Sequence, residues 1–295
     1  LRTLQERRRE EEKERAAEGG DNPYPDWEQL RREDREEPPS ITLTVRDAAG
    51  EIVRRIDGPA DKGFHRVAWD MRYPAPDPVT LAPRTDYAPW EGKPQGPMAL
   101  PGRYSVTLSR RVEGRWEDLA GPQEFSLKPL FTGGLVAEDR NDVLEFQAAT
   151  AELYRAVSGA DRAAAEIELR IGHLLLAAQD TPAVSEQQAA ALRALRTRMQ
   201  DLRVALNGDT TLARRGEPVP LDLLTRVATI AGGSWGSQAA VTGNHRASLE
   251  VASGQFPGLL AELKAIAAEL AGIEQALEDA GAPWTPSRIP DWPAE

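Results

Sequence analysis

Three side chains in a proline-rich stretch have the types and spacing to bind a ligand. Tyr87, Trp90 and Glu91 fall within five residues of one another, inside the segment 74–100. Aromatic faces stack on sugar rings or on peptide side chains, and a neighbouring carboxylate accepts hydrogen bonds from the same ligand. The pattern predicts a carbohydrate or peptide contact. The alternative is that both rings hold the loop onto the rest of the protein, because a long loop needs anchors to stay ordered.

Catalytic and metal chemistry have weaker candidates. Asp70 follows Trp69, but an aspartate at the end of a strand commonly accepts backbone N–H groups of the next turn, and Arg72 is near enough to pair with it. A glycoside hydrolase needs two facing carboxyl groups roughly 5 to 10 Å apart, and the sequence offers no such pair. The chain has no cysteine, and its three histidines lack metal-ligand spacing. We therefore predict no catalytic residue, no metal site and no cofactor.

Charge and hydropathy limit the partners. The formal net charge of −11 repels phosphate backbones, so nucleic acid is not an expected partner. No apolar run approaches the ~20 residues that a membrane-spanning helix needs, so no membrane insertion is expected. The first residue is Leu1 where an initiator methionine is usual. We expect a fragment or a processed product, and composition alone leaves the compartment open.

The elements that position these side chains begin with an arm, residues 1–40. Its first twenty residues are almost wholly charged and predict a solvated helix that ends near Gly19. Two prolines then lead to a short helical face at Trp27, with Asp26 as its cap. Trp27 is the expected anchor of this arm against the domain that follows.

Residues 41–130 alternate between apolar and polar, which is typical of strands with one buried face. We expect six or seven short strands in an Ig-like antiparallel β-sandwich, with the proline-rich segment 74–100 as an insertion and a hairpin turn at Glu113. Trp69, Asp70, Arg72 and Tyr104 are its expected structural anchors. The inward residues of the predicted strands are Ile41, Leu43 and Val45; Ile52, Val53 and Ile56; Phe64, Val67 and Trp69; Tyr104, Val106 and Leu108; and Phe125 and Leu127.

Residues 135–281 carry apolar side chains at alternating steps of four and three, as in the series from Phe146 to Ala178. This heptad stripe predicts an antiparallel helical bundle of three long helices and a shorter one near Leu221 to Ile230. Trp235 is expected to plug one end of the bundle. The tail 282–295 is irregular, and Trp284 and Trp292 are expected to fold back as anchors. The fold class is therefore α+β with several domains.

Four segments carry a resemblance to a known family. They are YPDWEQLRREDREEPPSITLTVRDAAGEIVRRI, HRVAWDMRYPAPDPV, LPGRYSVTLSRRV and GAPWTPSRIPDW. The chain resembles the C-terminal region of bacterial proteins with sortilin-type or neuraminidase-repeat (BNR) β-propellers, often labelled glycosyl hydrolase. Its strand segment is similar to the Ig-like domain of the flagellar hook-cap type.

The resemblance implies that catalytic or binding propeller blades, and the first strand of the Ig-like domain, lie upstream of Leu1. It also implies a periplasmic or secreted protein. An unpaired edge of the sandwich is then expected, covered by the propeller portion of the same protein or by another chain. On this basis we expect a non-catalytic accessory region. The alternatives are a carbohydrate- or peptide-binding module that uses the Tyr87 loop, and part of a glycoside hydrolase whose active site is in the propeller.

Overall fold

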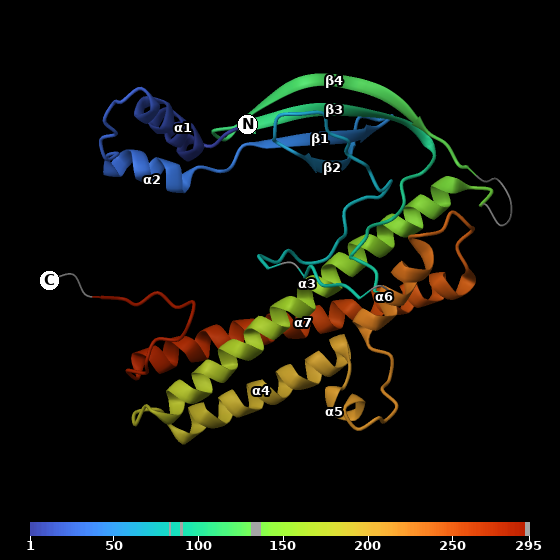
Figure 1. The fold of residues 1–295 in the computed structure, drawn as a ribbon. Coiled ribbons are helices and arrows are strands. Elements are labelled where there is room, and N and C mark those ends of the chain that lie inside the picture. Colours follow the sequence, from blue (N-terminus) through green and yellow to red (C-terminus); the bar gives the residue numbers. More distant parts are fainter. Residues whose placement is uncertain (83, 89–90, 131–136, 293–295) are drawn as a thin grey trace. The chain divides into compact units, whose positions relative to one another are not determined.

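The computed structural model describes residues 1–82, 84–88, 91–130 and 137–292 (Figure 1). The chain divides into two compact units. The sheet unit consists of Leu1–Pro74 and Met98–Gly133, and the helical unit consists of Ala75–Pro97 and Gly134–Glu295. The chain is therefore an α+β protein, in which a four-stranded antiparallel sheet is followed by a packed helical region.

The sheet unit begins with the arm, two helices named α1 (Leu4–Ala17) and α2 (Trp27–Arg35). Thr3 and Glu6 form a capping box at the start of α1, and Asp26 caps α2. None of the described residues of the two helices is buried. Ion pairs hold the helices together instead: Arg8 donates to both carboxylate oxygens of Glu33, at 2.6 and 2.7 Å, and to Glu12 at 2.6 Å.

The sheet contains β1 (Ser40–Asp47), β2 (Ile52–Gly58), β3 (Gly102–Val112) and β4 (Arg115–Leu127). The strand order is β2-β1-β3-β4, and every pair is antiparallel. Glu113 and Gly114 join β3 to β4 with positive φ angles of 52° and 74°, which match the twist of a two-residue hairpin. The predicted strands around Ile41, Ile52, Tyr104 and Phe125 and the turn at Glu113 are confirmed.

The strand predicted at Phe64, Val67 and Trp69 is wrong. Residues 64–70 have no strand assignment, and the Phe64 side chain is fully exposed. Trp69 still packs on the sheet: its indole nitrogen donates to the Arg72 carbonyl, and its ring lies 5.4 Å from the ring of Tyr104. The segment therefore lies against the sheet without joining its ladder, and the described residues form one sheet of four strands.

The core of the sheet unit is small. Its buried apolar residues are Val45, Val53, Ala99 and Tyr104. Partly buried side chains extend it, including Ile56, Trp69, Tyr73, Val106, Phe125 and Leu127. One half of the sheet therefore has a packed apolar face.

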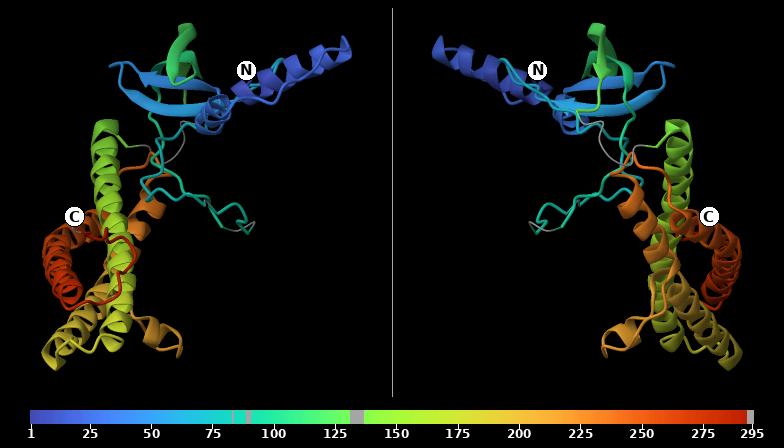
Figure 2. Two further views of the ribbon diagram at one scale, coloured as in Figure 1. Left: turned by 90° about the vertical axis from the view of Figure 1, so that its left-hand side faces the viewer. Right: turned by 90° about the vertical axis from the view of Figure 1, so that its right-hand side faces the viewer.

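The helical unit contains α3 (Arg140–Gln179), α4 (Glu186–Asn207), α5 (Thr210–Ala213), α6 (Leu223–Ser234) and α7 (Gly243–Asp279). Helix α4 runs antiparallel to α3 and α7, as Figures 1 and 2 show. The predicted three long helices and shorter helix are confirmed, and most residues of the predicted stripes are buried in one core. That core includes Val157, Ile171, Leu195, Met199, Leu206, Ile266 and Leu270.

Candidate functional site

The outer edge of β4 is the candidate functional site of the sheet unit. β4 is an edge strand because β3 is its neighbour in a strand order that ends there. All ten residues from Arg115 to Glu124 are exposed, and the apolar side chains among them include Trp116 and Leu119, which are 56% and 45% exposed. An edge strand offers a row of backbone N–H and C=O groups to which a further strand can pair.

The hairpin orders the side chains of this edge. Arg110 on β3 pairs with Glu117 on β4 at 2.7 Å, and these residues are directly opposite in the ladder. The Arg111 guanidinium lies 5.6 Å from the centre of the Trp116 ring and also pairs with Glu37 at 2.8 Å. The exposed Trp116 ring is therefore held on one side by a cation, which leaves its other face available for contact.

A glycine divides the β4 edge into two parts. Gly121 has φ +107°, and a Cβ atom there would lie 2.7 Å from the Val106 carbonyl oxygen. Pro122, which follows, has no backbone N–H to donate. The ladder shifts register opposite this point, on both sides of Leu108. Arg115–Ala120 is therefore a six-residue stretch of edge that carries both exposed apolar side chains.

The proline-rich loop places two of its three predicted ligand-binding residues in one cluster. The Arg84 guanidinium lies 5.0 Å from the centre of the half-buried Tyr87 ring. Glu91 accepts a hydrogen bond from the Ala88 N–H at 2.9 Å and from Arg84 at 2.6 Å, and these two bonds, in that order, lower the pKa of its carboxyl. Both groups are thus engaged within the loop. Trp90 lies outside the described residues.

The same loop is tied to the helical unit, to which Ala75–Pro97 belongs. The Tyr154 hydroxyl on α3 donates to Asp77 at 3.1 Å, and burial is the largest cause of the raised pKa of Tyr154. The Tyr154 ring in turn lies edge-on to Trp235, 5.7 Å away between ring centres. Trp235 is buried, as a residue that plugs the bundle should be.

The anchors expected in the sheet unit lie together beneath one face. The buried Tyr104 hydroxyl donates to the Leu100 carbonyl at 2.6 Å, and burial raises the pKa of Tyr104 to about 12. Asp70 accepts the Arg72 backbone N–H at 3.1 Å, which is the structural role predicted for it. The guanidinium that lies 3.7 Å from the Asp70 carboxylate is that of Arg54 on β2.

Three of the other tryptophans are not the buried anchors that the sequence predicts. Trp27 is 70% exposed, and its ring lies edge-on to Tyr24 instead of on the sheet. Trp292 is exposed, and Trp284 is partly so. Arg288 holds the tail instead, through ion pairs with Glu278 and, at 3.9 Å, with Glu274. Tryptophan is amphipathic, so its type alone does not decide whether it is buried.

Glu274 is a buried residue that sequence reasoning missed. Its side chain is 1% exposed, inside the apolar face of α7, and Arg170 on α3 donates to both of its oxygens at 2.7 Å. The heptad spacing placed Ile273 on this face, but Ile273 is only partly buried. Leu270 and Leu277 on the predicted stripe are both buried, so the local step is four residues and then three, where the heptad count placed three and then four.

Two further properties concern the residues that the structure describes. Among residues 1–82, 84–88, 91–130 and 137–292, no group of three His, Cys, Asp or Glu side chains is arranged to hold a metal ion. Over the same ranges, no helix has the length and apolar character needed to cross a membrane.

Comparisons with protein-family models, with curated proteins and with solved structures find no match for this chain.

Proposed function

We propose that this chain is a non-catalytic accessory region that docks on another folded part through the β4 edge of its sheet. The partner is the β-propeller portion of the same protein or a separate chain, in a protein of the periplasm or the cell exterior. The observation that carries the proposal is the exposed edge Arg115–Ala120, with Trp116 and Leu119 on it. Exposed aromatic and apolar side chains on an edge strand are typical of β-strand addition between folded parts.

The Ig-like identity of the sheet unit is part of the proposal. Its support is the Tyr104 hydroxyl, which donates to a backbone carbonyl four residues upstream, at Leu100. A tyrosine that bonds back to the backbone in this way marks one corner of Ig-like domains. The segment LPGRYSVTLSRRV, which carries the family resemblance, contains both residues. A fold of this type does not by itself fix a function, so the docking role rests on the β4 edge.

Amide hydrogen exchange tests the proposal. We expect those amides of residues 115–120 that point away from β3 to exchange more slowly in the complete gene product, purified from the cells that make it, than in the isolated chain. The β4 amides that bond to β3 serve as the internal control, because they should be protected in both samples. Leu119→Lys places a charge on the edge without disturbing a buried residue, and should abolish the difference. Equal exchange of residues 115–120 in the two samples would overturn the docking proposal.

A further inference from the structure

An apolar groove opens on the sheet at the end away from the packed core. Its volume is about 480 Å³, and Ile41, Leu43 and Leu108 from β1 and β3 line it. Leu1 also lines the groove, and its amino group donates to the Ala60 carbonyl. The side chains that line the groove are mostly aliphatic, so the groove is suited to an apolar side chain of a bound segment.

Basic and aromatic side chains border this groove. The segment from Lys62 to Arg66 follows β2, and Lys62, His65 and Arg66 are exposed on it. Phe64, between them, is 100% exposed. The groove lining includes the Asp61 carboxylate, and Lys62 and Arg66 on the same segment add two permanent cations, so the excess charge beside the groove is positive. This favours an apolar segment that also carries acidic side chains.

The tip of the arm has the complementary composition. Tyr24 and Trp27 are 77% and 70% exposed, with ring centres 6.1 Å apart and planes at 63°. Asp21, Asp26 and Glu28 flank them and are exposed, and the stretch 16–30 contains no lysine or arginine. Rings at this angle form a wedge instead of the flat platform on which a sugar stacks, so they fit a protein cavity better than a glycan.

The tip is ordered before it binds anything. The Gly20 N–H donates to the Arg15 carbonyl at 2.9 Å, and the Asn22 side chain donates to the Glu12 carbonyl at 2.9 Å. Asp26 accepts from the Gln29 N–H at 2.7 Å at the start of α2. A segment that is already ordered loses less conformational entropy when it binds.

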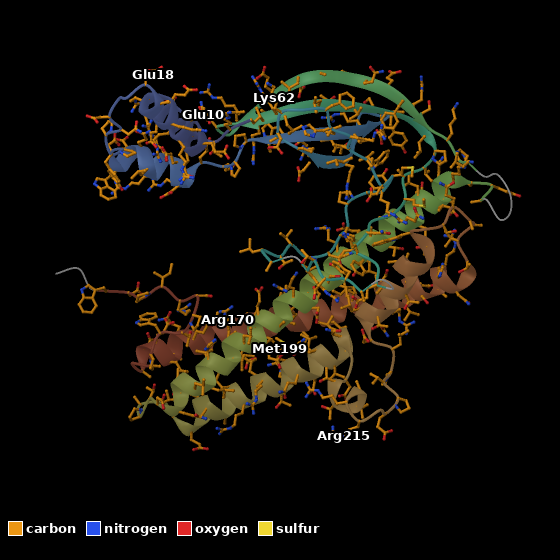
Figure 3. The ribbon with its side chains drawn as sticks, in the orientation of Figure 1. Glu10, Glu18, Lys62, Arg170, Met199 and Arg215 are labelled. Carbon is orange, nitrogen blue, oxygen red and sulfur yellow. The ribbon has the colours of Figure 1, made fainter. Side chains whose placement is uncertain are left out.

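The tip of one chain is remote from the groove of the same chain. Helix α1 starts three residues after Leu1, which lies at the groove, and its 14 residues span roughly 21 Å at 1.5 Å per residue. Figure 3 shows Glu18, at the far end of α1, well away from Lys62 beside the groove. The tip therefore reaches a groove only on a second copy of the chain while α1 remains helical.

We propose that two copies of this chain associate by exchanging their arms. The Tyr24–Trp27 tip of each copy enters the groove of the other, and its carboxylates face Lys62 and Arg66 of that copy. A two-fold arrangement makes the two contacts identical, and forming one makes the other intramolecular. The surfaces involved are separate from the β4 edge, so this association and the docking proposed above stand or fall separately.

Sedimentation equilibrium of the full chain over a range of concentrations and salt tests the exchange. We expect a monomer–dimer equilibrium that weakens as salt increases, because exposed charges steer the contact. Trp27→Ala should raise the dissociation constant at least about tenfold, as loss of a central aromatic contact does. Trp292→Ala is the matched control: that side chain is also exposed, and its loss should leave the dissociation constant unchanged.

A charge exchange makes the test specific to the two surfaces. Lys62→Glu with Arg66→Glu should prevent dimers, and so should Asp21→Lys with Glu28→Lys. An equimolar mixture of these two variants should form heterodimers again at low salt, because each of the two contacts between unlike chains then pairs opposite charges. A chain that stays monomeric, a dimer that Trp27→Ala does not weaken, or variants that do not recover when mixed would each overturn arm exchange.

Discussion

Replacing Arg170 with methionine should destabilise the helical unit more than loss of an ordinary surface ion pair. Glu274 is 1% exposed, and in the described part of the chain it pairs with Arg170 at 2.7 Å and, more distantly, with Arg288 at 3.9 Å. Loss of one partner of a buried pair costs roughly 3 to 5 kcal/mol. The Arg170 side chain is 37% exposed, however, and Arg288 remains, so we expect about 2 kcal/mol, or roughly thirtyfold in the unfolding equilibrium.

Replacing Glu274 in place of Arg170 should reduce the free energy of unfolding by less. Glu274→Met removes the buried charge itself and leaves Arg170, which is partly exposed, to water. Methionine fills an irregular core position well, so we expect a loss of under ~1 kcal/mol. The double variant, Arg170→Met with Glu274→Met, should then be about as stable as Glu274→Met alone. The measurement is urea unfolding followed by far-ultraviolet circular dichroism.

Arg198 supplies the matched control for this series. It bridges Glu262 and Glu269 between α4 and α7, and all three side chains are between 40% and 43% exposed. Arg198→Met should cost under ~1 kcal/mol because water solvates the carboxylates that it leaves. If Arg170→Met is as mild as Arg198→Met, or if the double variant loses the sum of its two single losses, then Glu274 is not a buried charge that depends on its partner.

Three further predictions concern the sheet unit. The folded-state pKa of Tyr104 is raised from 10.0 to about 12, so the folded state keeps a proton that the unfolded state loses. The stability of the sheet unit should therefore fall as the pH rises from 10 to 12. The urea midpoint of Tyr104→Phe should fall less over the same pH range. Gly121→Ala should cost about 2 kcal/mol at a positive φ beside a carbonyl oxygen, more than Gly50→Ala, whose surroundings are open. Hydrogen bonding to Arg8 lowers the pKa of Glu33, so the arm should stay ordered at neutral pH. It should become accessible to protease as the pH falls through the lowered pKa of Glu33. The arm of Arg8→Met should be accessible to protease already at neutral pH.

The helices were predictable because their signal is local and repeated. The stripe through Leu192, Leu195 and Met199 recurs at helical spacing, and all three residues are buried. The end of α3 was predictable as well, since the helix stops at Gln179, just before the Asp-Thr-Pro sequence that breaks it. What the spacing did not resolve was the exact face, and that error hid Glu274.

The strands show where pattern reasoning stops. Alternation at Phe64, Val67 and Trp69 is the same whether a segment pairs in a ladder or lies across the face of a sheet. A segment joins a ladder only beside a strand whose backbone N–H and C=O groups are free to pair. The sequence does not show which strand that is. Trp69 was correctly predicted as an anchor, because a large apolar ring tends to pack against other side chains. The segment that carries Trp69 was wrongly predicted to be a strand.

The exposed side chains were the hardest to predict, because a side chain is exposed when no other element of the fold packs against it. Trp27 follows an acidic stretch and is exposed, whereas Trp69 follows an alternating stretch and packs on Tyr104. A tryptophan is buried only where another element supplies apolar area. The arm supplies none, since none of its described helical residues is buried. The signal for Trp27 was therefore the charged composition of its own surroundings.

The two units differ in how much they depend on partners. The helical unit has one continuous core that joins α3, α4, α6 and α7, whereas the core of the sheet unit contains four buried apolar residues among those that the structure describes. A domain with so small a core is marginal on its own, and anything that binds its folded form adds stability in proportion to the logarithm of the partner concentration. Docking at β4 and exchange of arms both act on this unit alone. Binding at either surface should therefore raise the unfolding temperature of the sheet unit and leave that of the helical unit unchanged.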